Sequence, residues 1–512
     1  MQSGVFSRRV LSLGLALFAA LAIGFGFFSV DNINPIVDIL VMLTFGIIAL
    51  YWYQHGKAVW LLYLFVLLQP FVILHIPVFG PAKLQHALLA ILGIIFITDL
   101  LRKKISYIRF GSLFAPILLF VFIAGISTIL NRAETEEFRS ILILLSNLAF
   151  YLLAINYIRS SKKLWHLVSS WLAAVFLLTL SGVAFYIHAR YTGAFYADYF
   201  QYSPADNLLR LSSFAVDSNF FANHLVFVIP ILLALILTKK LAISKLKKYS
   251  LWFFAVLATS GIFLSYSRGA LIALAVTLLA YIFFEKGYKH YLNWAKLFLV
   301  VVAAFALSII IQPDFLKSFI TRIPVQDQYQ SEKTEIANKL DLRIEKESLR
   351  NRKVVVFTQK KRDVSREAID VRIVLWDTGI RIFQDHMWLG VGTGNFPTYF
   401  KKYADQEKYG HLNSLGIHNA YLEVLVEHGI VGLLSFVLLL FFVLRNIWIR
   451  YQNSQGMMKV LAFGFLITAI AHLIHLLFKD GGLYLTSTWL LITVSGIMEF
   501  LPPQKDSHEK TN

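Results

Sequence analysis

The sequence contains no cysteine, and only 15% of its 512 residues carry a charged side chain. The absence of cysteine excludes disulfide bonds and thiolate metal sites, but it leaves the redox compartment open. The low charged fraction, together with 57% hydrophobic residues and a mean hydropathy of +0.65, excludes a soluble globular protein. This composition is typical of a protein built from membrane-spanning helices.

Hydrophobic runs close to the length of about 20 residues that crosses a bilayer recur along nearly the whole chain. They predict an all-α polytopic membrane protein with about 12–14 transmembrane helices. The first run follows a basic flank but is long enough to span, so we interpret it as a helix and not as a cleavable signal peptide. The expected spans are residues 10–29, 35–53, 58–75, 84–101, 112–130, 140–158, 164–187, 220–238, 250–266, 269–284, 295–311, 420–444, 459–478 and 482–500.

The net charge of +18 is distributed unevenly between the two sides of these spans. Lysine and arginine gather in alternate loops, among them "RKKISYIR", "RSSKK", "KKLAISKLKK" and "RNIWIRYQNSQGMMK", whereas "DNIN", "NRAETEEFR" and "KDGG" on the other side have little net positive charge. The positive-inside rule therefore predicts that both termini and the basic loops are cytoplasmic. Because the basic residues follow this pattern, we do not expect nucleic acid as a partner.

Two long segments interrupt the spans on the external side, residues 188–219 and a large loop at residues 312–419. Connections of this length are usually functional or disordered. In the large loop, Ile336, Leu340 and Ile344 recur at helical spacing among charges, which predicts an amphipathic helix; a solvated insert without chemistry is the alternative. We therefore divide the chain into an N-terminal helix bundle (1–187), a motif-bearing transmembrane region (188–311), the large periplasmic loop (312–419), and C-terminal helices with a cytoplasmic tail (420–512).

The stretch "HNAYLEVLVEHGIVG", residues 418–432, places polar residues where a membrane helix begins on the external side. On an ideal helix, His418, Gly429 and Gly432 share one face, and the missing side chains of the glycines would let another helix pack closely. An interfacial anchor or a helix cap is the alternative role for such a histidine. Asn419 is suited either to orient the imidazole or to cap the helix.

Ionisable residues at the external ends of two spans predict a functional site. Glu423 and Glu427 lie four residues apart in an apolar run, where such groups tend to face a cavity or a partner. In "SYSRGA", Arg268 ends one span with no basic neighbour, so we expect it to meet an anion or a carboxylate. Two alternatives satisfy this expectation: Arg268 forms a structural ion pair with one of the two glutamates, or it binds phosphate through two parallel hydrogen bonds.

Two further segments carry polar residues on the same side: "RLSSFAVDSNFFANH" at residues 210–224, and "VRIVLWDTGIRIFQDHMWLGVGTGNFPTYF" at residues 371–400. In the first, Asp217 or Ser218 is suited to cap the following helix. In the second, the glycines of "GVGTGNF" predict a tight turn and not a nucleotide loop. Metal-ligand spacings such as HExxH and nucleophile motifs such as GxSxG do not occur, so we expect no metal site.

These four segments together resemble a known family. "HNAYLEVLVEHGIVG" resembles the histidine motif of the bacterial O-antigen ligase and polymerase superfamily, and "SYSRGA" resembles its serine–arginine motif. The segments around residues 371–400 and 210–224 are similar to its arginine–tryptophan–glycine and aspartate/asparagine segments, and all four occur in the expected order. The resemblance implies a glycosyltransferase-C-like helix bundle in the bacterial inner membrane, with its site on the periplasmic side.

The resemblance also implies a reaction: transfer of a glycan from undecaprenyl diphosphate to a hydroxyl of lipid A–core, with inversion and with neither metal nor other cofactor. His418 would be the general base, and Arg268 and Arg372 would stabilise the leaving diphosphate. The residues expected to contact substrate are Arg210, Asn219, Ser267, Arg381, Asn395, Asn419 and Glu423.

Other functions remain open at this stage. A polymerase would use the same donor with a carrier-linked repeat as acceptor, and an Arg-x10-Gly pattern typical of polymerases occurs from Arg381 to Gly392. An oligosaccharyltransferase acting on protein is a further possibility. A transporter with buried charges in its substrate path is the alternative from another class, although we find no inverted repeat.

Overall fold

The computed structural model describes residues 47–71, 84–131, 135–192, 200–203, 208–238, 244–284, 290–316, 364–481 and 485–502, apart from residues 49, 216, 314, 414 and 480. The expected span 10–29, most of the span 35–53 and the amphipathic helix expected around Leu340 lie outside these residues. The elements are α3 (Val59–Leu68), α4 (Leu84–Leu101), α5 (Phe114–Leu130), α6 (Thr135–Tyr157), α7 (Ser161–Thr192), β1 (Phe200–Ser203), β2 (Leu208–Leu211), η2 (Ser213–Ala215), α8 (Ser218–Leu237), α9 (Lys245–Ser265), α10 (Arg268–Phe284), α11 (His290–Ile311), α14 (Val364–Asp385), α15 (Phe396–Tyr403), α16 (Gln406–Tyr409), η3 (Gly410–Leu412), α17 (Ala420–Asn453), α18 (Gly456–His475), η4 (Leu476–Phe478) and α19 (Thr486–Phe500).

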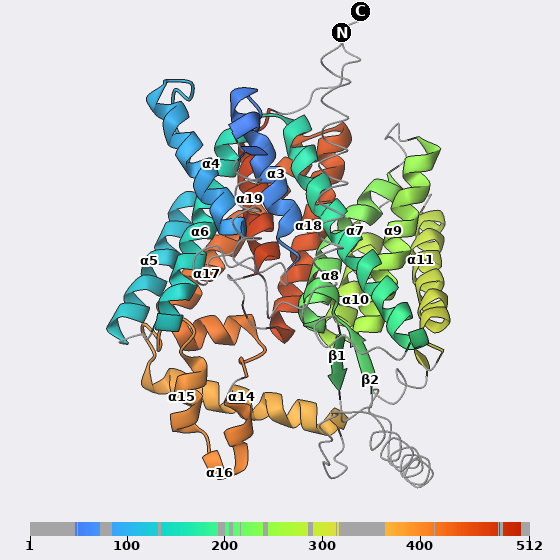
Figure 1. Cartoon of the computed structure of the whole chain (residues 1–512). Helices are drawn as coiled ribbons and strands as arrows, with labels where there is room; N and C mark the ends of the chain where they lie inside the picture. The colour runs from blue at the N-terminus through green and yellow to red at the C-terminus, as the bar shows by residue number, and fades with distance from the viewer. Residues whose placement is uncertain are drawn as a thin grey trace, which may run out of the picture.

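The fold is an all-α polytopic membrane protein, as predicted (Figure 1). In the described part of the chain, seven helices are long and apolar enough to cross a membrane, in α6, α7, α8, α9, α11, α17 and α18. A short antiparallel hairpin, in which Phe200 of β1 pairs with Leu211 of β2, is an addition to the predicted helices. It lies in the first long segment that separates two spans.

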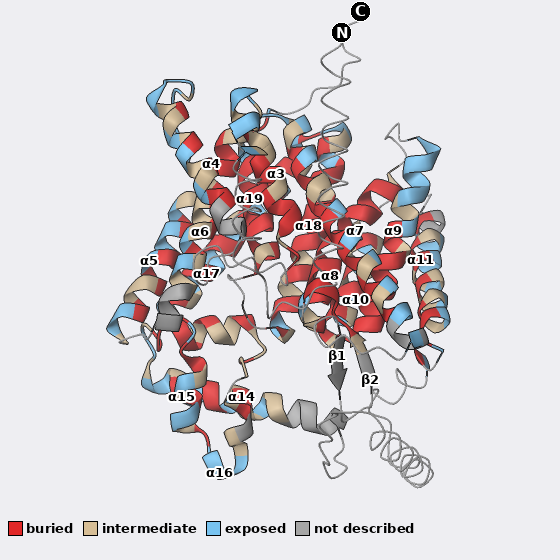
Figure 2. Cartoon of the chain, in the orientation of Figure 1, coloured by how far each residue is buried: buried red, intermediate tan, exposed pale blue. Residues whose placement is uncertain are grey.

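The core of the bundle surrounds α8. Almost every residue of this helix is buried, and α18 and α9 pack along it most extensively (Figure 2). A helix that is apolar on every face can be stable only when other helices surround it. By contrast, α5, α11 and α17 expose large hydrophobic side chains such as Phe122, Phe298 and Leu434. Exposed apolar faces of this kind mark the surface that contacts lipid.

The bundle has two chemically different ends. Arg102, Lys103 and Lys104 after α4, and Lys245, Lys247 and Lys248 in α9, lie at one end, which we call the basic end. The helices α14, α15 and α16 lie at the opposite end, which we call the α14 end (Figure 1). The positive-inside rule predicts that the basic end is cytoplasmic.

Part of the large loop between α11 and α17 is a small helical domain, which we call the α14 domain and define as residues 364–419. It has an apolar core of its own, separate from that of the membrane bundle. The first turns of α17 contribute to this core through Val426, so the domain is packed onto the start of that helix. The core residues are Leu375, Ile382, Val391, Phe396, Phe400, Ala404, Leu412, Ile417 and Val426.

Candidate functional site

His418 lies in the loop directly before α17, in the left-handed backbone region with φ of 54°. The next residue, Asn419, is the N-cap of α17, because its side-chain oxygen accepts hydrogen bonds from the backbone nitrogens of Tyr421 and Leu422, both at 3.1 Å. The capping role considered for Asn419 is therefore confirmed. The cap fixes where the helix begins and leaves the imidazole outside it, at the α14 end.

The α14 domain holds the loop that carries His418. The indole nitrogen of Trp376 donates a hydrogen bond to the carbonyl oxygen of Ile417 at 2.9 Å. At Gly379, one turn further along α14, an added Cβ would lie 2.5 Å from the Ile417 side chain, so helix and loop are in close contact. Arg372 precedes Trp376 by four residues and therefore shares the face of α14 that meets this loop.

Arg381 lies on the other side of α14. Nine residues separate it from Arg372, which at 3.6 residues per turn puts the two side chains on opposite faces. Its guanidinium forms an ion pair with Asp377 at 3.0 Å and donates to the carbonyl oxygen of Tyr403 at 3.4 Å. These contacts join α14 to the end of α15, so the structure gives Arg381 a role within the domain and does not bring it to the His418 loop.

α17 is broken at Gly429, whose φ of 66° and ψ of −168° are not helical. The predicted shared face of His418, Gly429 and Gly432 is therefore wrong, because His418 precedes the helix and the break changes its direction before Gly432. The helical segments on the two sides of Gly429 are residues 420–428 and 430–453.

The backbone of residues 387–392 fills the break. Val391 and Gly392 donate to the carbonyl oxygens of Val426 and Glu427 at 3.0 and 2.9 Å, and Ile430 donates to the carbonyl oxygen of Met387 at 2.9 Å. These hydrogen bonds replace those that the helix loses, which is necessary for a backbone away from water.

Glycine is required at this junction by contact with backbone, and not by a neighbouring helix as expected. A Cβ on Gly429 would lie 2.2 Å from the carbonyl oxygen of Trp388, and a Cβ on Gly390 would lie 2.4 Å from the carbonyl carbon of Glu427. Both glycines have a φ of +66°. The predicted tight turn in "GVGTGNF" is confirmed, because Gly392 and Gly394 also have positive φ; within it, buried Asn395 donates to the carbonyl oxygen of Val391 at 2.8 Å.

A second cluster joins the aspartate/asparagine segment to the serine–arginine motif. Arg210 donates from Nε to the carbonyl oxygen of Ser265 at 2.9 Å and from Nη2 to the side-chain oxygen of Asn219 at 3.3 Å. Asp217 caps α8, as expected, by accepting hydrogen bonds from the backbone nitrogens of Asn219 and Phe220. The strand β2, the start of α8 and the end of α9 therefore meet at Arg210.

The serine–arginine motif forms a sharp turn between two helices. α9 ends at Ser265, Tyr266 adopts the left-handed conformation with φ of 52°, and α10 begins at Arg268. Ser267 is buried in this turn, and its backbone nitrogen donates to the hydroxyl of Ser265 at 3.2 Å. The turn places Arg268 at the N-terminus of α10, where the helix dipole favours an anion.

The end of α18 connects the histidine motif to the serine–arginine turn. Tyr421 donates to the carbonyl oxygen of Leu473 at 2.9 Å, and Glu423 accepts from the backbone nitrogen of Gly481 at 2.6 Å. On the other side, a Cβ on Gly269 would lie 2.7 Å from Cβ of Phe478. Both motifs therefore contact one short segment, residues 473–481.

Lys479 in this segment was missed by the sequence analysis. It is only 2% exposed, and its Nζ lies 3.1 Å from the centre of the Phe220 ring at the start of α8. A buried ammonium needs compensating interactions, and the ring of Phe220 supplies one of them. The sequence does contain a signal: Lys479 is a lysine at the end of an apolar run, on the side where basic residues are sparse. It belongs to "KDGG", which the charge pattern treats only as a loop of low net charge.

Buried polar side chains continue from Lys479 into the bundle. His475 and the side-chain oxygen of Asn223 are 3.1 Å apart, and Asn223 donates to the hydroxyl of Ser487 at 2.7 Å. These bonds fix α18 against α8 and α19 below the motifs. Among the residues that the structure describes, no group of three or more histidine, cysteine, aspartate or glutamate side chains is arranged to hold a metal ion.

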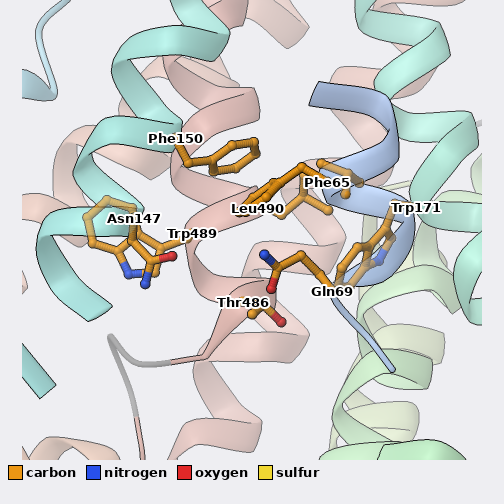
Figure 3. A pocket seen from close by; sticks show the side chains of 9 residues that line it. Phe65, Gln69, Asn147, Phe150, Trp171, Thr486, Trp489 and Leu490 are labelled. Atoms are coloured by element: carbon orange, nitrogen blue, oxygen red, sulfur yellow. The ribbon is translucent and has the colours of Figure 1, made fainter. Parts of the chain in front are cut away.

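A small cavity deeper in the bundle is not the substrate site. It lies between α3, α6, α7 and α19, and its lining includes Gln69, Asn147 and Trp171 (Figure 3). Its volume of about 10 Å³ holds about one water molecule and no sugar.

The comparisons with known proteins agree with the resemblance found in the motifs. The sequence model of the O-antigen ligase family matches residues 253–437, from within α9 to beyond the break in α17. The matched region contains the serine–arginine turn, the α14 domain and the histidine motif. A comparison with curated proteins gave no match. The predicted resemblance is thus confirmed for residues 253–437: this region of the multi-pass membrane protein is similar to the O-antigen ligase family.

Proposed function

We propose that the protein transfers a glycan from undecaprenyl diphosphate to a sugar hydroxyl at the α14 end, on the outer face of the bacterial inner membrane. The observation that carries this proposal is the convergence of two motifs: the start of α17 after His418 and the start of α10 at Gly269 both contact residues 473–481. The family match covers both motifs.

We assign the binding of the donor's diphosphate to the positively charged side chains of this region. Arg268 lies at the N-terminus of α10, and Lys479 lies beside the start of α8, so both are close to helix ends whose dipoles favour negative charge. Arg372, on the face of α14 next to the His418 loop, completes the set. In the reaction, the bond between the anomeric carbon and the phosphate oxygen breaks, and these cations stabilise the charge that develops on the diphosphate.

We assign the deprotonation of the acceptor hydroxyl to His418. As the new bond forms between the acceptor oxygen and the anomeric carbon, the hydroxyl proton passes to the imidazole. Undecaprenyl diphosphate leaves from the opposite side of that carbon, so the configuration is inverted. His418 lies outside α17 and is only half-buried, so we assign its side chain to an acceptor in the headgroup layer.

The remaining predicted residues are proposed to position these groups. Arg210, Asn219 and Ser267 fix the turn before Arg268. Asn419 and Glu423 fix the start of α17 against the α18 end. Asn395 and Arg381 shape the α14 domain, each through a bond to a backbone carbonyl.

We propose lipid A–core as the acceptor, which makes the protein a ligase. The polymerase alternative depends on the pattern from Arg381 to Gly392, but Arg381 pairs with Asp377 and Gly392 bonds to α17, and both contacts are internal. Contacts within the protein are sufficient to explain both residues. The pattern therefore does not favour a second carrier-linked substrate, which a polymerase would need.

Purified protein supplied with a labelled carrier-linked glycan tests the proposal. Lipid A–core and a carrier-linked repeat are offered in separate reactions, with His418→Ala as the inactive control. Label on lipid A–core supports the ligase, and a lengthened carrier-linked chain makes the protein a polymerase. If neither acceptor is labelled and no undecaprenyl diphosphate is released, the proposal fails.

A further inference from the structure

A large cavity lies at the basic end, far along the bundle from the His418 loop. It is bounded by the first half of α7, the last turns of α8, the start of α9 and the start of α18, and its volume is about 830 Å³. A volume of this size is typical of a site for a whole ligand. The first half of α7 and the start of α9, which contribute most of the lining, lie in the upper part of Figure 1.

The lining of the cavity changes from apolar to polar toward the basic end. Its walls are apolar over most of their length, and the hydroxyl and ammonium groups all come from residues 244–250, at the first turns of α9. Such a division suits a molecule with a long apolar part and one polar end. The apolar lining residues are Trp165, Leu172, Ala173, Phe176, Leu232, Leu235, Leu251, Phe253, Phe254 and Met457.

The polar end of the cavity is strongly basic. Lys247 lines the cavity, Lys245 and Lys248 lie in the same first turn of α9, and all three side chains are exposed. The first turn of α9 contains no acidic residue. Because cations at a helix N-terminus oppose the helix dipole, this arrangement is unfavourable by itself and becomes favourable when an anion binds there.

The side of the cavity is open to the bilayer. Phe253 is 53% exposed and Tyr249 is 69% exposed, although α8, which lines the same cavity, is almost entirely buried. Aromatic side chains at this level are typical of the membrane interface. A lipid can therefore reach the cavity laterally, with its headgroup at the lysines.

We propose that this cavity binds an anionic phospholipid of the cytoplasmic leaflet, with its acyl chains between α7, α8 and α9 and its phosphate at Lys245, Lys247 and Lys248. Basic pockets between transmembrane helices on the cytoplasmic side are suited to anionic headgroups. This site is separate from the proposed transfer site, which lies at the opposite end of the bundle. It stabilises the packing of α9 on α7 and α8 without taking part in the chemistry.

The test measures which lipid stays bound after purification. The protein is extracted from membranes that contain phosphatidylglycerol and phosphatidylcholine, and the retained lipids are counted by native mass spectrometry. We expect selective retention of phosphatidylglycerol. Changing Lys245, Lys247 and Lys248 together to glutamine should lower it by about fivefold for each lysine that contacts the phosphate. Changing Arg102, Lys103 and Lys104 to glutamine is the matched control, because it removes equal charge at the same end from residues that do not line this cavity.

A second variant tests the cavity itself. Ala173 is exposed and lines the cavity, so Ala173→Phe fills space there without disturbing the core. It should displace the lipid while all the lysines remain. Equal loss of phosphatidylglycerol in the lysine and control variants would reduce the effect to general surface charge and overturn the proposal. Unchanged retention of phosphatidylglycerol in Ala173→Phe would also overturn it.

Discussion

The indole nitrogen of Trp376 lies 2.9 Å from the carbonyl oxygen of Ile417 and donates a hydrogen bond to it. A helix of the α14 domain thereby fixes the residue directly before His418. Because His418 is held in a left-handed conformation in a loop, its orientation depends on such neighbouring contacts. The α14 domain is therefore part of the arrangement that determines where the imidazole lies.

Trp376→Phe should lower the turnover rate by about 10- to 100-fold, on the scale of a misplaced catalytic group. Phenylalanine keeps the aromatic packing but cannot donate to Ile417. We expect the KM for the carrier-linked donor to stay unchanged, since the cations are not altered. The measurement is steady-state transfer by purified protein, and Trp388→Phe at an exposed position is the control. An equal effect in both variants would mean that the indole acts only through general stability.

His418→Ala should lower transfer by about 100- to 10,000-fold and leave the protein folded and inserted. Donor binding should persist, because the proposed phosphate contacts come from other residues. The matched control is His386→Ala, which removes another histidine of the α14 domain, one that packs edge-on against Tyr399. Near-normal turnover by His418→Ala would reduce this residue to an interfacial anchor.

Arg268→Lys should cause a severe loss of transfer, because lysine keeps the charge and loses the planar fork that binds phosphate at two points. A loss of about 2–4 kcal/mol of transition-state stabilisation corresponds to a preorganised charge contact. The comparison is with Glu423→Gln. If Arg268→Lys is fully active while Glu423→Gln destabilises the protein, Arg268 serves as a structural ion-pair partner.

Lys479→Gln should weaken binding of the carrier lipid more than it lowers the rate of glycan transfer in the bound complex. Its ammonium is buried beside Phe220, so removing the charge takes away an attraction to phosphate that solvent does not screen. The measurement is the equilibrium affinity for undecaprenyl diphosphate. Lys408, an exposed lysine of the α14 domain, provides the control substitution. Unchanged affinity in Lys479→Gln would restrict this residue to a structural contact with α8.

Gly429→Ala should destabilise the protein by more than about 2 kcal/mol, from the left-handed backbone and the collision with the carbonyl oxygen of Trp388. The reference is Gly125→Ala in α5, where an added Cβ meets nothing within 4 Å. That variant should stay within about 1 kcal/mol of the wild type. The melting temperatures of the two variants in detergent are compared. Equal stability would contradict the requirement for glycine at this junction.

The sequence predicts those parts of the fold that depend on local rules. Apolar runs predict the spans because a helix must cross about 30 Å of hydrocarbon. The caps Asp217 and Asn419 could be predicted because their side chains bond to backbone only two and three residues away. The turn at "GVGTGNF" was predicted because glycine is the residue that readily adopts positive φ.

The parts that the sequence did not predict depend on contacts between distant segments. The break at Gly429 follows from residues 387–392, which replace the lost helix bonds, and an isolated helical pattern contains no sign of them. Arg210 could be recognised as part of the aspartate/asparagine segment, but its bond to Ser265 needs the hairpin and the end of α9 to meet. Lys479 appeared in a loop of low net charge, and only the packing of α18 on α8 buries it.

The junction at Gly429 also has a consequence for how the protein is assembled. Residues 387–392 leave the ribosome before α17, so under the proposed topology we expect the turn that completes the broken helix to be translocated before α17 inserts. Until the two meet, the backbone groups at residues 426–430 have no partners, and hydrocarbon cannot supply them. We therefore expect final insertion of α17 to be coupled to docking of the segment before it, so that a defect in the α14 domain becomes a defect in membrane insertion.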